Sequence, residues 1–193
     1  MILSNYELFP LYVDGKIDKN NAMIQCVGAF ERHNIDTLEE LYLIVASADS
    51  VYAPIYWKNN KRCVDNAILN DIDLIIYDSD DGDTEEEISE MLKGVEFLLL
   101  RTASWSEKLE KYRIFIPLAQ PVSFTTANEY TLLYRWLGNL IGLNQDSATN
   151  ECARGYIGIS GKEGIIQRGE RINPIPLWDK HLKLITTKAN MKP

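Results

Sequence analysis

Cysteine is scarce in this sequence of 193 residues, and long apolar runs are missing altogether. The three cysteines, Cys26, Cys63 and Cys152, are odd in number and far apart, so they match neither a disulfide framework nor a zinc site. No run of about 18 apolar residues is present, so a membrane span is not expected. The first residues carry no basic segment of the kind that opens a signal peptide. We therefore expect a protein of the reducing cytoplasm, with no zinc site and no membrane contact.

A net positive charge, a common property of nucleic-acid-binding proteins, is also missing. The formal net charge is −8, but it is spread unevenly along the chain. Residues 152–193 contain eight Lys and Arg against three Asp and Glu, whereas residues 1–151 contain 12 against 25. A basic end beside an acidic body is typical of a polyanion-binding face, and an ordinary solvated surface is the alternative interpretation.

Internal repeats and low-complexity linkers are absent as well, so no domain boundary is visible in the sequence. The length suits one domain over residues 1–193 and is sufficient to bury a core.

The most informative stretch is acidic and follows a short apolar run. Residues 74–77 have the length and composition of a buried strand, and four aspartates, Asp78, Asp80, Asp81 and Asp83, follow. Because side chains alternate along a strand, Asp78 and Asp80 are expected on the same side, about 7 Å apart. Two carboxylates this close repel each other unless a cation lies between them, and Mg²⁺ or Mn²⁺ suits such oxygen ligands.

The acidic stretch has two other interpretations. A solvated acidic loop at the end of a buried strand is the plainest. An EF-hand calcium loop is excluded, because with Gly82 at its sixth position the loop would begin at Tyr77 and end at Ile88, and neither is a ligand.

Hydrophobic spacing and capping signals predict the other elements. Helices are expected over 21–32, over 37–46 with a capping box at Thr37, over 85–92 with Thr84 as N-cap, and over 127–143 with Thr125 or Thr126 as N-cap. Strands are expected over 95–104, 112–118, 156–160 and 164–168, a strand or loop over 8–13, and a hairpin over 55–64 turning at residues 59 and 60. This order predicts an α+β fold with helices on one face of a mostly antiparallel sheet.

Four stretches resemble, in order and spacing, the motifs of one family. Residues 75–82 are an apolar strand ending in Asp-x-Asp, and residues 99–105 are a strand that runs into Thr-Ala-Ser-Trp. Residues 112–122 contain Arg-x-x-x-Pro-Leu, and residues 142–156 contain an Asp followed by an Arg. Together they resemble the catalytic core of the archaeo-eukaryotic primase (Prim-Pol) superfamily, in the branch found in plasmid, phage and mobile-element replication proteins.

The resemblance covers about residues 69–158. It implies an RRM-like primase-polymerase core, with residues 1–68 as an N-terminal α/β part of the same domain. It also implies an enzyme: metal-dependent nucleotidyl transfer that makes primers on single-stranded DNA. The expected partners are the DNA template, nucleoside triphosphates and, as for many family members, a replicative helicase.

The resemblance assigns roles to individual residues. Asp78, Asp80 and Asp146 would hold two Mg²⁺ or Mn²⁺ ions about 3.5–4 Å apart, as nucleotidyl transfer requires. The residues that would contact the incoming nucleotide are Arg113, Arg154, Ser104 and Lys108, with Lys111 also within reach. Alternatives remain open at two of these positions. Asp146 would otherwise be an Asx-turn residue, and Arg113 would otherwise only pair with the acidic stretch.

One departure from the family pattern concerns the second motif, which normally presents a His to the nucleotide phosphates. Residues 102–105 contain none, because Ala103 or Trp105 stands in its place, and the two histidines, His33 and His181, lie outside the motifs. Arg101, Ser104 or Lys108 would then replace it, or nucleotide binding is impaired. Trp105 would stack on a base or serve as a half-buried packing residue, and His33 is expected to cap or flank a helix end.

Three other functions compete with the primase. A catalytically degenerate primase-like domain that binds DNA or an origin as a replication initiator fits the missing His and the acidity. A haloacid-dehalogenase-like phosphatase also uses a strand ending in Asp-x-Asp, but 77 residues precede Asp78 here and Gly82 stands where that motif has Thr. A structural or scaffold role is the third.

Overall fold

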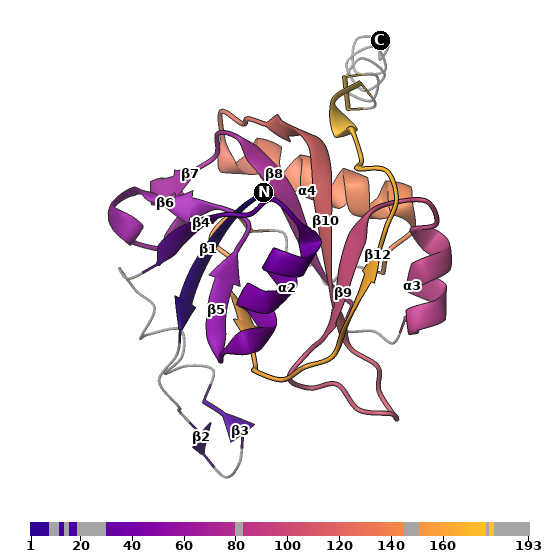
Figure 1. The fold of residues 1–193 in the computed structure, drawn as a ribbon. Coiled ribbons are helices and arrows are strands. Elements are labelled where there is room, and N and C mark those ends of the chain that lie inside the picture. The colour runs from indigo at the N-terminus through magenta and orange to yellow at the C-terminus, as the bar shows by residue number, and fades with distance from the viewer. Residues whose placement is uncertain are drawn as a thin grey trace, which may run out of the picture.

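The computed structural model describes residues 1–7, 12–13, 16–18, 30–79, 83–144, 151–176 and 178–179, which form an α+β fold (Figure 1). The helices are α2 (Leu38–Ser47), α3 (Glu85–Met91) and α4 (Ala127–Ile141), with short 3-10 turns at Lys58–Asn60 and Val64–Asn66. The strands are β1 (Ile2–Glu7), β2 (Tyr12–Val13), β3 (Lys16–Ile17), β4 (Glu31–Asn34), β5 (Ser50–Ala53), β6 (Tyr56–Trp57), β7 (Ala67–Ile68), β8 (Ile72–Ser79), β9 (Phe97–Arg101), β10 (Tyr112–Val122), β11 (Tyr156–Gly158) and β12 (Gly164–Gln167).

The strands form two four-stranded antiparallel sheets. The central sheet has the order β12-β9-β10-β8 and contains the strands of the first three motif stretches. The second sheet has the order β11-β5-β1-β4. Two further pairs, β2 with β3 and β6 with β7, are short antiparallel ladders. The α+β class with mostly antiparallel pairing is confirmed, but the strands are divided between two sheets rather than gathered in one.

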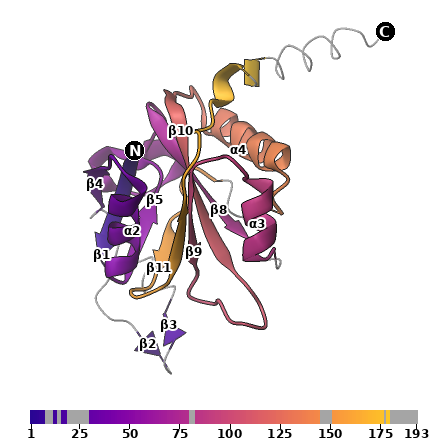
Figure 2. The ribbon, with the colours of Figure 1, turned by 45° about the vertical axis from the view of Figure 1, so that its right-hand side comes forward.

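Both faces of the central sheet are covered. Because strand side chains alternate, Ile75 and Tyr77 of β8 belong to a core cluster that includes Ile88 of α3 and Leu133 of α4. Their neighbours Leu74 and Ile76, together with Phe115, belong to a second cluster with Leu38 of α2 and Leu3 of β1. Figure 2 shows α3 and α4 on one side of β8, β9 and β10, and α2 with β1 and β5 on the other. The expectation of helices on one face only was therefore wrong, because the N-terminal third of the chain covers the opposite face.

Local capping signals set the helix starts as the sequence predicts. Thr37 and Thr84 both form complete capping boxes with the glutamate three residues later, Glu40 and Glu87. At the start of α4, the N-cap is Thr126 rather than Thr125. None of the helices within the described ranges has the length and apolar character needed to span a lipid bilayer.

Several expectations for the first 68 residues were wrong. Residues 31–34 form β4 rather than the end of a helix, so His33 lies within a strand and does not cap a described helix. Residues 19–29 lie outside the described residues, as do residues 8–11 of the predicted strand or loop, whose last two residues form β2. The hairpin after residue 55 does turn at Asn59 and Asn60, which both have positive φ, but its second arm is β7 rather than residues 61–64.

In the central sheet, β10 continues past Pro117 to Val122 with a shift of register.

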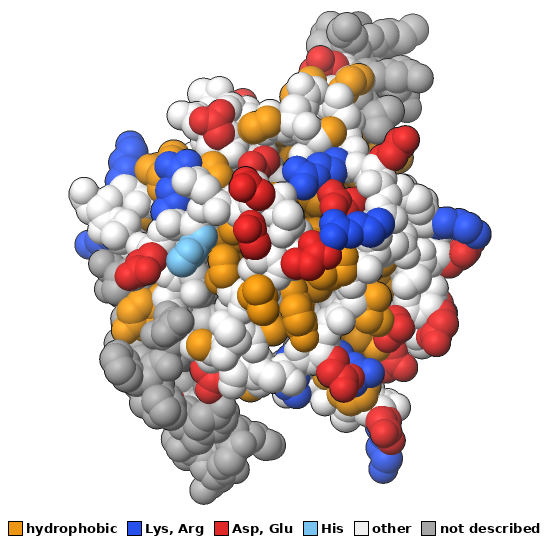
Figure 3. All heavy atoms as spheres, in the orientation of Figure 1, with side chains coloured by type: hydrophobic (Ala, Val, Ile, Leu, Met, Phe, Trp, Pro, Cys, Tyr) orange, Lys and Arg blue, Asp and Glu red, His pale blue; other side chains and the backbone are white. Residues whose placement is uncertain are grey.

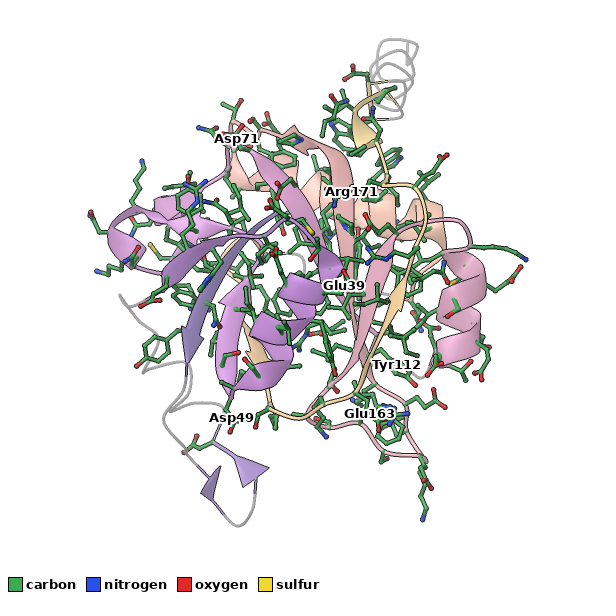
Figure 4. The ribbon with its side chains drawn as sticks, viewed as in Figure 1. Glu39, Asp49, Asp71, Tyr112, Glu163 and Arg171 are labelled. Carbon is green, nitrogen blue, oxygen red and sulfur yellow. The ribbon has the colours of Figure 1, made fainter. Side chains whose placement is uncertain are left out.

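Charged contacts fasten the segment after β12 to α2 and β9. Arg171 Nε donates to Glu96 Oε2 at 2.7 Å, and Arg168 pairs with both Glu96 and Glu39 of α2. Figure 4 shows Glu39 and Arg171 on this face. Acidic and basic side chains are mixed over the same face in Figure 3, so it does not present the single sign of charge that a polyanion-binding surface needs.

Replacing Gly169 with alanine is expected to destabilise the protein by about 1–3 kcal/mol. A Cβ at this position would lie 2.4 Å from the carbonyl oxygen of Gly94 and 2.6 Å from the carbonyl carbon of Val95. Because these are backbone atoms, they cannot shift as easily as the end of a flexible side chain. Urea unfolding followed by circular dichroism measures the change. Glu170→Ala, at the next position, which is exposed, is the matched control, and its free energy of unfolding should stay within about 0.5 kcal/mol of the parent. A change equally small in Gly169→Ala would show that the close approach of the backbone is relaxed in solution.

Candidate active site

Asp78 and Arg113 face each other across two neighbouring strands. In the antiparallel register of β8 and β10 they are direct partners, and residues so paired have Cβ atoms about 4.5–5.5 Å apart. Arg113 Nε donates to Asp78 Oδ1 at 2.6 Å, and Nη2 donates to Oδ2 at 3.3 Å. Only 5% of Asp78 and 8% of Arg113 is exposed. The strand register thus creates a bidentate ion pair that is withdrawn from water.

Arg113 also links the two sheets. Its Nη1 donates to the Tyr52 hydroxyl of β5 and to the Ile157 carbonyl of β11, both at 2.8 Å. The rings of Tyr52 and Tyr156 lie 5.4 and 4.9 Å from its guanidinium carbon, within the range of cation–π attraction. Burial lowers the pKa of Arg113, but Asp78 and Tyr52 together raise the pKa above its ordinary value. The guanidinium therefore stays charged although it is buried.

Most of the hydrogen-bonding capacity of Arg113 is used within the protein. A guanidinium has five N–H hydrogens, and the four bonds to Asp78, Tyr52 and Ile157 leave one hydrogen on Nη2. The pairing of Arg113 with the acidic stretch, which the sequence left open as an alternative, is therefore present at Asp78. An arginine held in this way fixes the orientation of the carboxylate it contacts.

A cavity of about 410 Å³ lies beside this ion pair. Its lining residues come from the connection between β6 and β7, the ends of β8 and β9, the start of β10, and the segment leading into β11: Arg62, Asp78, Thr102, Ala103, Ser104, Lys111, Arg113, Glu151, Ala153, Arg154, Gly155, Tyr156 and Ile157. Four of these side chains are cationic and two are acidic. Among the described residues the lining therefore has an excess of positive charge, in a protein whose net charge is −8, a combination that favours an anionic ligand.

The structure places the predicted site residues unequally. Asp78, Ser104, Arg113 and Arg154 line the one cavity, and Lys111 joins them. Lys108 is exposed on the connection between β9 and β10 and is not part of the lining. Asp80 and Asp146 lie outside the described residues, so their distance from Asp78 stays a prediction.

Three residues of this site have no role in the sequence-based prediction: Arg62 and Glu151, which line the cavity, and Tyr52, which contacts Arg113. Arg62 stands in a connection far from the motifs, and Tyr52 lies in a buried strand that the sequence analysis did not identify. Arg62 and Tyr52 lie outside the four motif stretches, and contacts between segments distant in the sequence place them here: Arg62 donates to the Ala153 carbonyl, and Tyr52 accepts from Arg113.

The second motif stretch contributes small side chains to the cavity. Thr102, Ala103 and Ser104 all line it, and no histidine is among the described lining residues. Trp105 does not line it. Instead it packs against the core, and the Arg101 guanidinium carbon lies 3.9 Å from the centre of its ring. Trp105 thus occupies the half-buried packing position that the sequence left open, with one ring face already covered.

Asp78 retains capacity for a cation. A carboxylate has about four lone-pair sites, and Arg113 occupies two of them. Within the described ranges, no group of three or more His, Cys, Asp or Glu side chains is placed to hold a metal ion. The donor set proposed from the sequence would be completed by Asp80 and Asp146, both beyond those ranges.

Comparisons with known proteins return little. No protein-family model matches the sequence, and no curated protein matches it. Among solved structures, the chain is similar to the AEP domain of the primase-polymerase (PrimPol) of cyanophage S-2L, with 14% sequence identity and a TM-score of 0.49, over 92% of this chain and 87% of that one. A similarity of this degree transfers neither an activity nor the role of any residue.

Proposed function

We propose that this protein is a metal-dependent nucleotidyltransferase that synthesises primers on single-stranded DNA during the replication of a plasmid, phage or mobile element. The observation that carries the proposal is the meeting of Asp78, Ser104, Arg113 and Arg154 at one cavity. Each comes from a different one of the four stretches that resemble primase-polymerase motifs. The described part of the cavity lining also carries more cationic than acidic side chains, which suits a triphosphate.

In this proposal Asp78, Asp80 and Asp146 hold the Mg²⁺ or Mn²⁺ ions, which would activate the primer 3′-hydroxyl and neutralise the triphosphate. Arg113 orients Asp78 and keeps the carboxylate matched by a positive charge in its buried position. Arg154 and Ser104 contact the nucleotide from the cavity wall, and Lys108 reaches it from the exposed connection.

Template-directed synthesis tests the proposal. The protein is incubated with Mn²⁺ or Mg²⁺, a homopolymeric single-stranded template and labelled nucleotides, with ribonucleotides and deoxyribonucleotides in separate reactions. We expect incorporation of the complementary nucleotide only, and none when the template is omitted or the metal is chelated. Incorporation that ignores the template, or none with either metal, would overturn the proposal.

A second candidate function is a primase-like domain that binds DNA or an origin without polymerising. One observation favours it: the small Ala103 lines the cavity where the family pattern would place a histidine on the phosphates. Tight binding of single-stranded or origin DNA in a mobility-shift assay, combined with no product under any metal, is the result that this candidate predicts. The phosphatase alternative is less well supported, because both oxygens of Asp78 accept hydrogen bonds from Arg113 and the carboxylate is a weakened nucleophile.

A further inference from the structure

Arg62 reaches the cavity from outside the motif-bearing part of the chain. It lies in the connection between β6 and β7, between the two 3-10 turns. Its Nη1 donates to the carbonyl oxygen of Ala153 at 2.9 Å, a contact that spans 91 positions in the sequence and fixes the side chain to the opposite wall. Ala153 and Arg154 line the cavity together with Arg62. An arginine from the N-terminal third is thus held beside the residues of the fourth motif stretch.

Two polar groups of this cavity are buried and have no partner. Arg62 Nε and Thr102 Oγ1 are both withdrawn from solvent, and neither has a hydrogen-bond partner among the described residues. Buried polar groups are nearly always satisfied, so each exception calls for an explanation, and a ligand oxygen is a common one. Both orphaned groups belong to residues that line the same cavity. A ligand that accepts hydrogen bonds in the cavity would satisfy both.

The charges of the cavity define the class of that ligand. The positive charge of Arg113 is matched by Asp78 within the bidentate pair. The other charged side chains in the described part of the lining are Arg62, Lys111, Arg154 and Glu151. Guanidinium groups bind phosphate oxygens through two parallel N–H bonds, and a threonine hydroxyl adds a further donor. A polyphosphate matches these donors better than a single carboxylate, because it offers several acceptor oxygens along its length.

We propose that Arg62 and Thr102 form a subsite for the terminal phosphates of a nucleoside triphosphate. The identity of the ligand rests on the function proposed above. Arg62 donates through Nε and its unengaged N–H groups, and Thr102 donates through its hydroxyl. Because Arg62 lies in the β6–β7 connection and Thr102 follows β9, the bound triphosphate bridges the N-terminal third of the chain and the central sheet.

Binding of inorganic tripolyphosphate, measured by titration calorimetry without DNA, tests the subsite directly. Arg62→Ala should weaken the affinity at least about tenfold, as expected for the loss of a charge-assisted pair. The affinity of Arg62→Lys should lie between those of the parent protein and Arg62→Ala, because lysine keeps the charge but lacks the forked geometry of a guanidinium. Thr102→Val, which keeps the shape and removes the hydroxyl, should weaken binding by about threefold or more. A deoxynucleoside triphosphate should show the same order of affinities.

Arg32→Ala is the matched control, since it removes the same charge from the exposed strand β4, where Arg32 contacts the ring and hydroxyl of Tyr56. Its affinity should change less than about twofold. The thermal unfolding midpoint of every variant confirms that it is folded. Equal losses for Arg62→Ala and Arg32→Ala would overturn the subsite, and so would a loss of single-stranded DNA binding with unchanged tripolyphosphate affinity.

The binding and synthesis experiments distinguish failure of the subsite from failure of the nucleotidyltransferase proposal. If the parent protein binds tripolyphosphate through Arg62 but makes no templated product, the subsite is supported and the polymerase is not. If the parent protein makes templated product and Arg62→Ala leaves the KM for nucleotide unchanged, the polymerase is supported and the subsite is overturned.

Discussion

Replacing Arg113 with methionine is expected to lower the free energy of unfolding by about 3–5 kcal/mol, the usual cost of removing one partner from a buried ion pair. The substitution would leave Asp78 buried without a counter-charge and would remove the donors now bound by the Tyr52 hydroxyl and the Ile157 carbonyl. Urea unfolding monitored by circular dichroism measures the loss.

Arg101→Met on the neighbouring strand is the matched control for that experiment. Arg101 also has an acidic partner, Glu163, but its side chain is 30% exposed and that of Glu163 is 75% exposed. A pair this open to solvent contributes about 0–1 kcal/mol, so the control should cost much less. Similar losses for the two variants would show that the buried contacts of Arg113 stabilise the protein no more than a solvent-exposed ion pair does.

A double-mutant cycle separates the pair from its surroundings. The double variant Asp78→Asn/Arg113→Met should be less destabilised than the sum of the two single variants, because the second substitution removes the charge that the first left unmatched. Tyr52→Phe provides a milder comparison. It removes one acceptor of Arg113 Nη1, while the Ile157 carbonyl still accepts from the same nitrogen, so a loss of about 1–2 kcal/mol is expected.

The geometry of the proposed metal site depends on how the two sheets pack, because Arg113 contacts both Asp78 and the second sheet. Asp78 and Arg113 belong to the central sheet, whereas Tyr52 and Ile157 belong to β5 and β11 of the second sheet. The orientation of the carboxylate that would hold a metal ion therefore depends on contacts across the sheet interface. Substitutions in the second sheet are expected to alter that orientation without touching a nucleotide.

The elements that the sequence predicts correctly are those with local signals. Capping boxes at Thr37 and Thr84 begin two helices where expected, and the apolar stretches that become β8, β9 and β10 were recognised from their composition. These signals depend on a few neighbouring residues. They need no knowledge of what the element packs against.

The elements that were mistaken or missed depend on distant partners. Strand β4 has the sequence Glu-Arg-His-Asn and is mostly exposed, so it has neither alternation nor β-branched residues to identify it. Backbone pairing with β1 makes it a strand. The division into two sheets has the same origin, since β5 and β11 pair across about a hundred positions of sequence.

The candidate site shows the same division. The sequence motifs identified Asp78, Ser104, Arg113 and Arg154, which the structure brings to one cavity. They could not identify Arg62, because its place in the cavity follows from a hydrogen bond to a carbonyl in the last third of the chain. A residue whose role depends on one long-range contact cannot be recognised from a pattern in a single sequence.

Asp80→Asn is expected to reduce template-directed incorporation at least about 10³-fold while the free energy of unfolding stays within about 0.5 kcal/mol of the parent. The substitution keeps the size of the side chain and removes the negative charge that would bind the metal ion. Initial rates at saturating Mn²⁺, template and nucleotide measure the effect. Asp146→Asn should behave in the same way, because the proposal gives both carboxylates the same role.

Asp65→Asn supplies the control, since it makes the same chemical change in the short turn Val64–Asn66 away from the cavity lining and should leave the rate within about twofold. Asp80 is a sharper test than Asp78, because Asp78→Asn also breaks the buried pair with Arg113 and would lower activity through instability alone. Full activity in Asp80→Asn, with Asp78→Asn inactive and unstable, would assign Asp78 a structural role and would contradict the proposed binding of metal ions by Asp78, Asp80 and Asp146. Loss of activity in Asp80→Asn and Asp146→Asn with unchanged stability is the result that three converging carboxylates require.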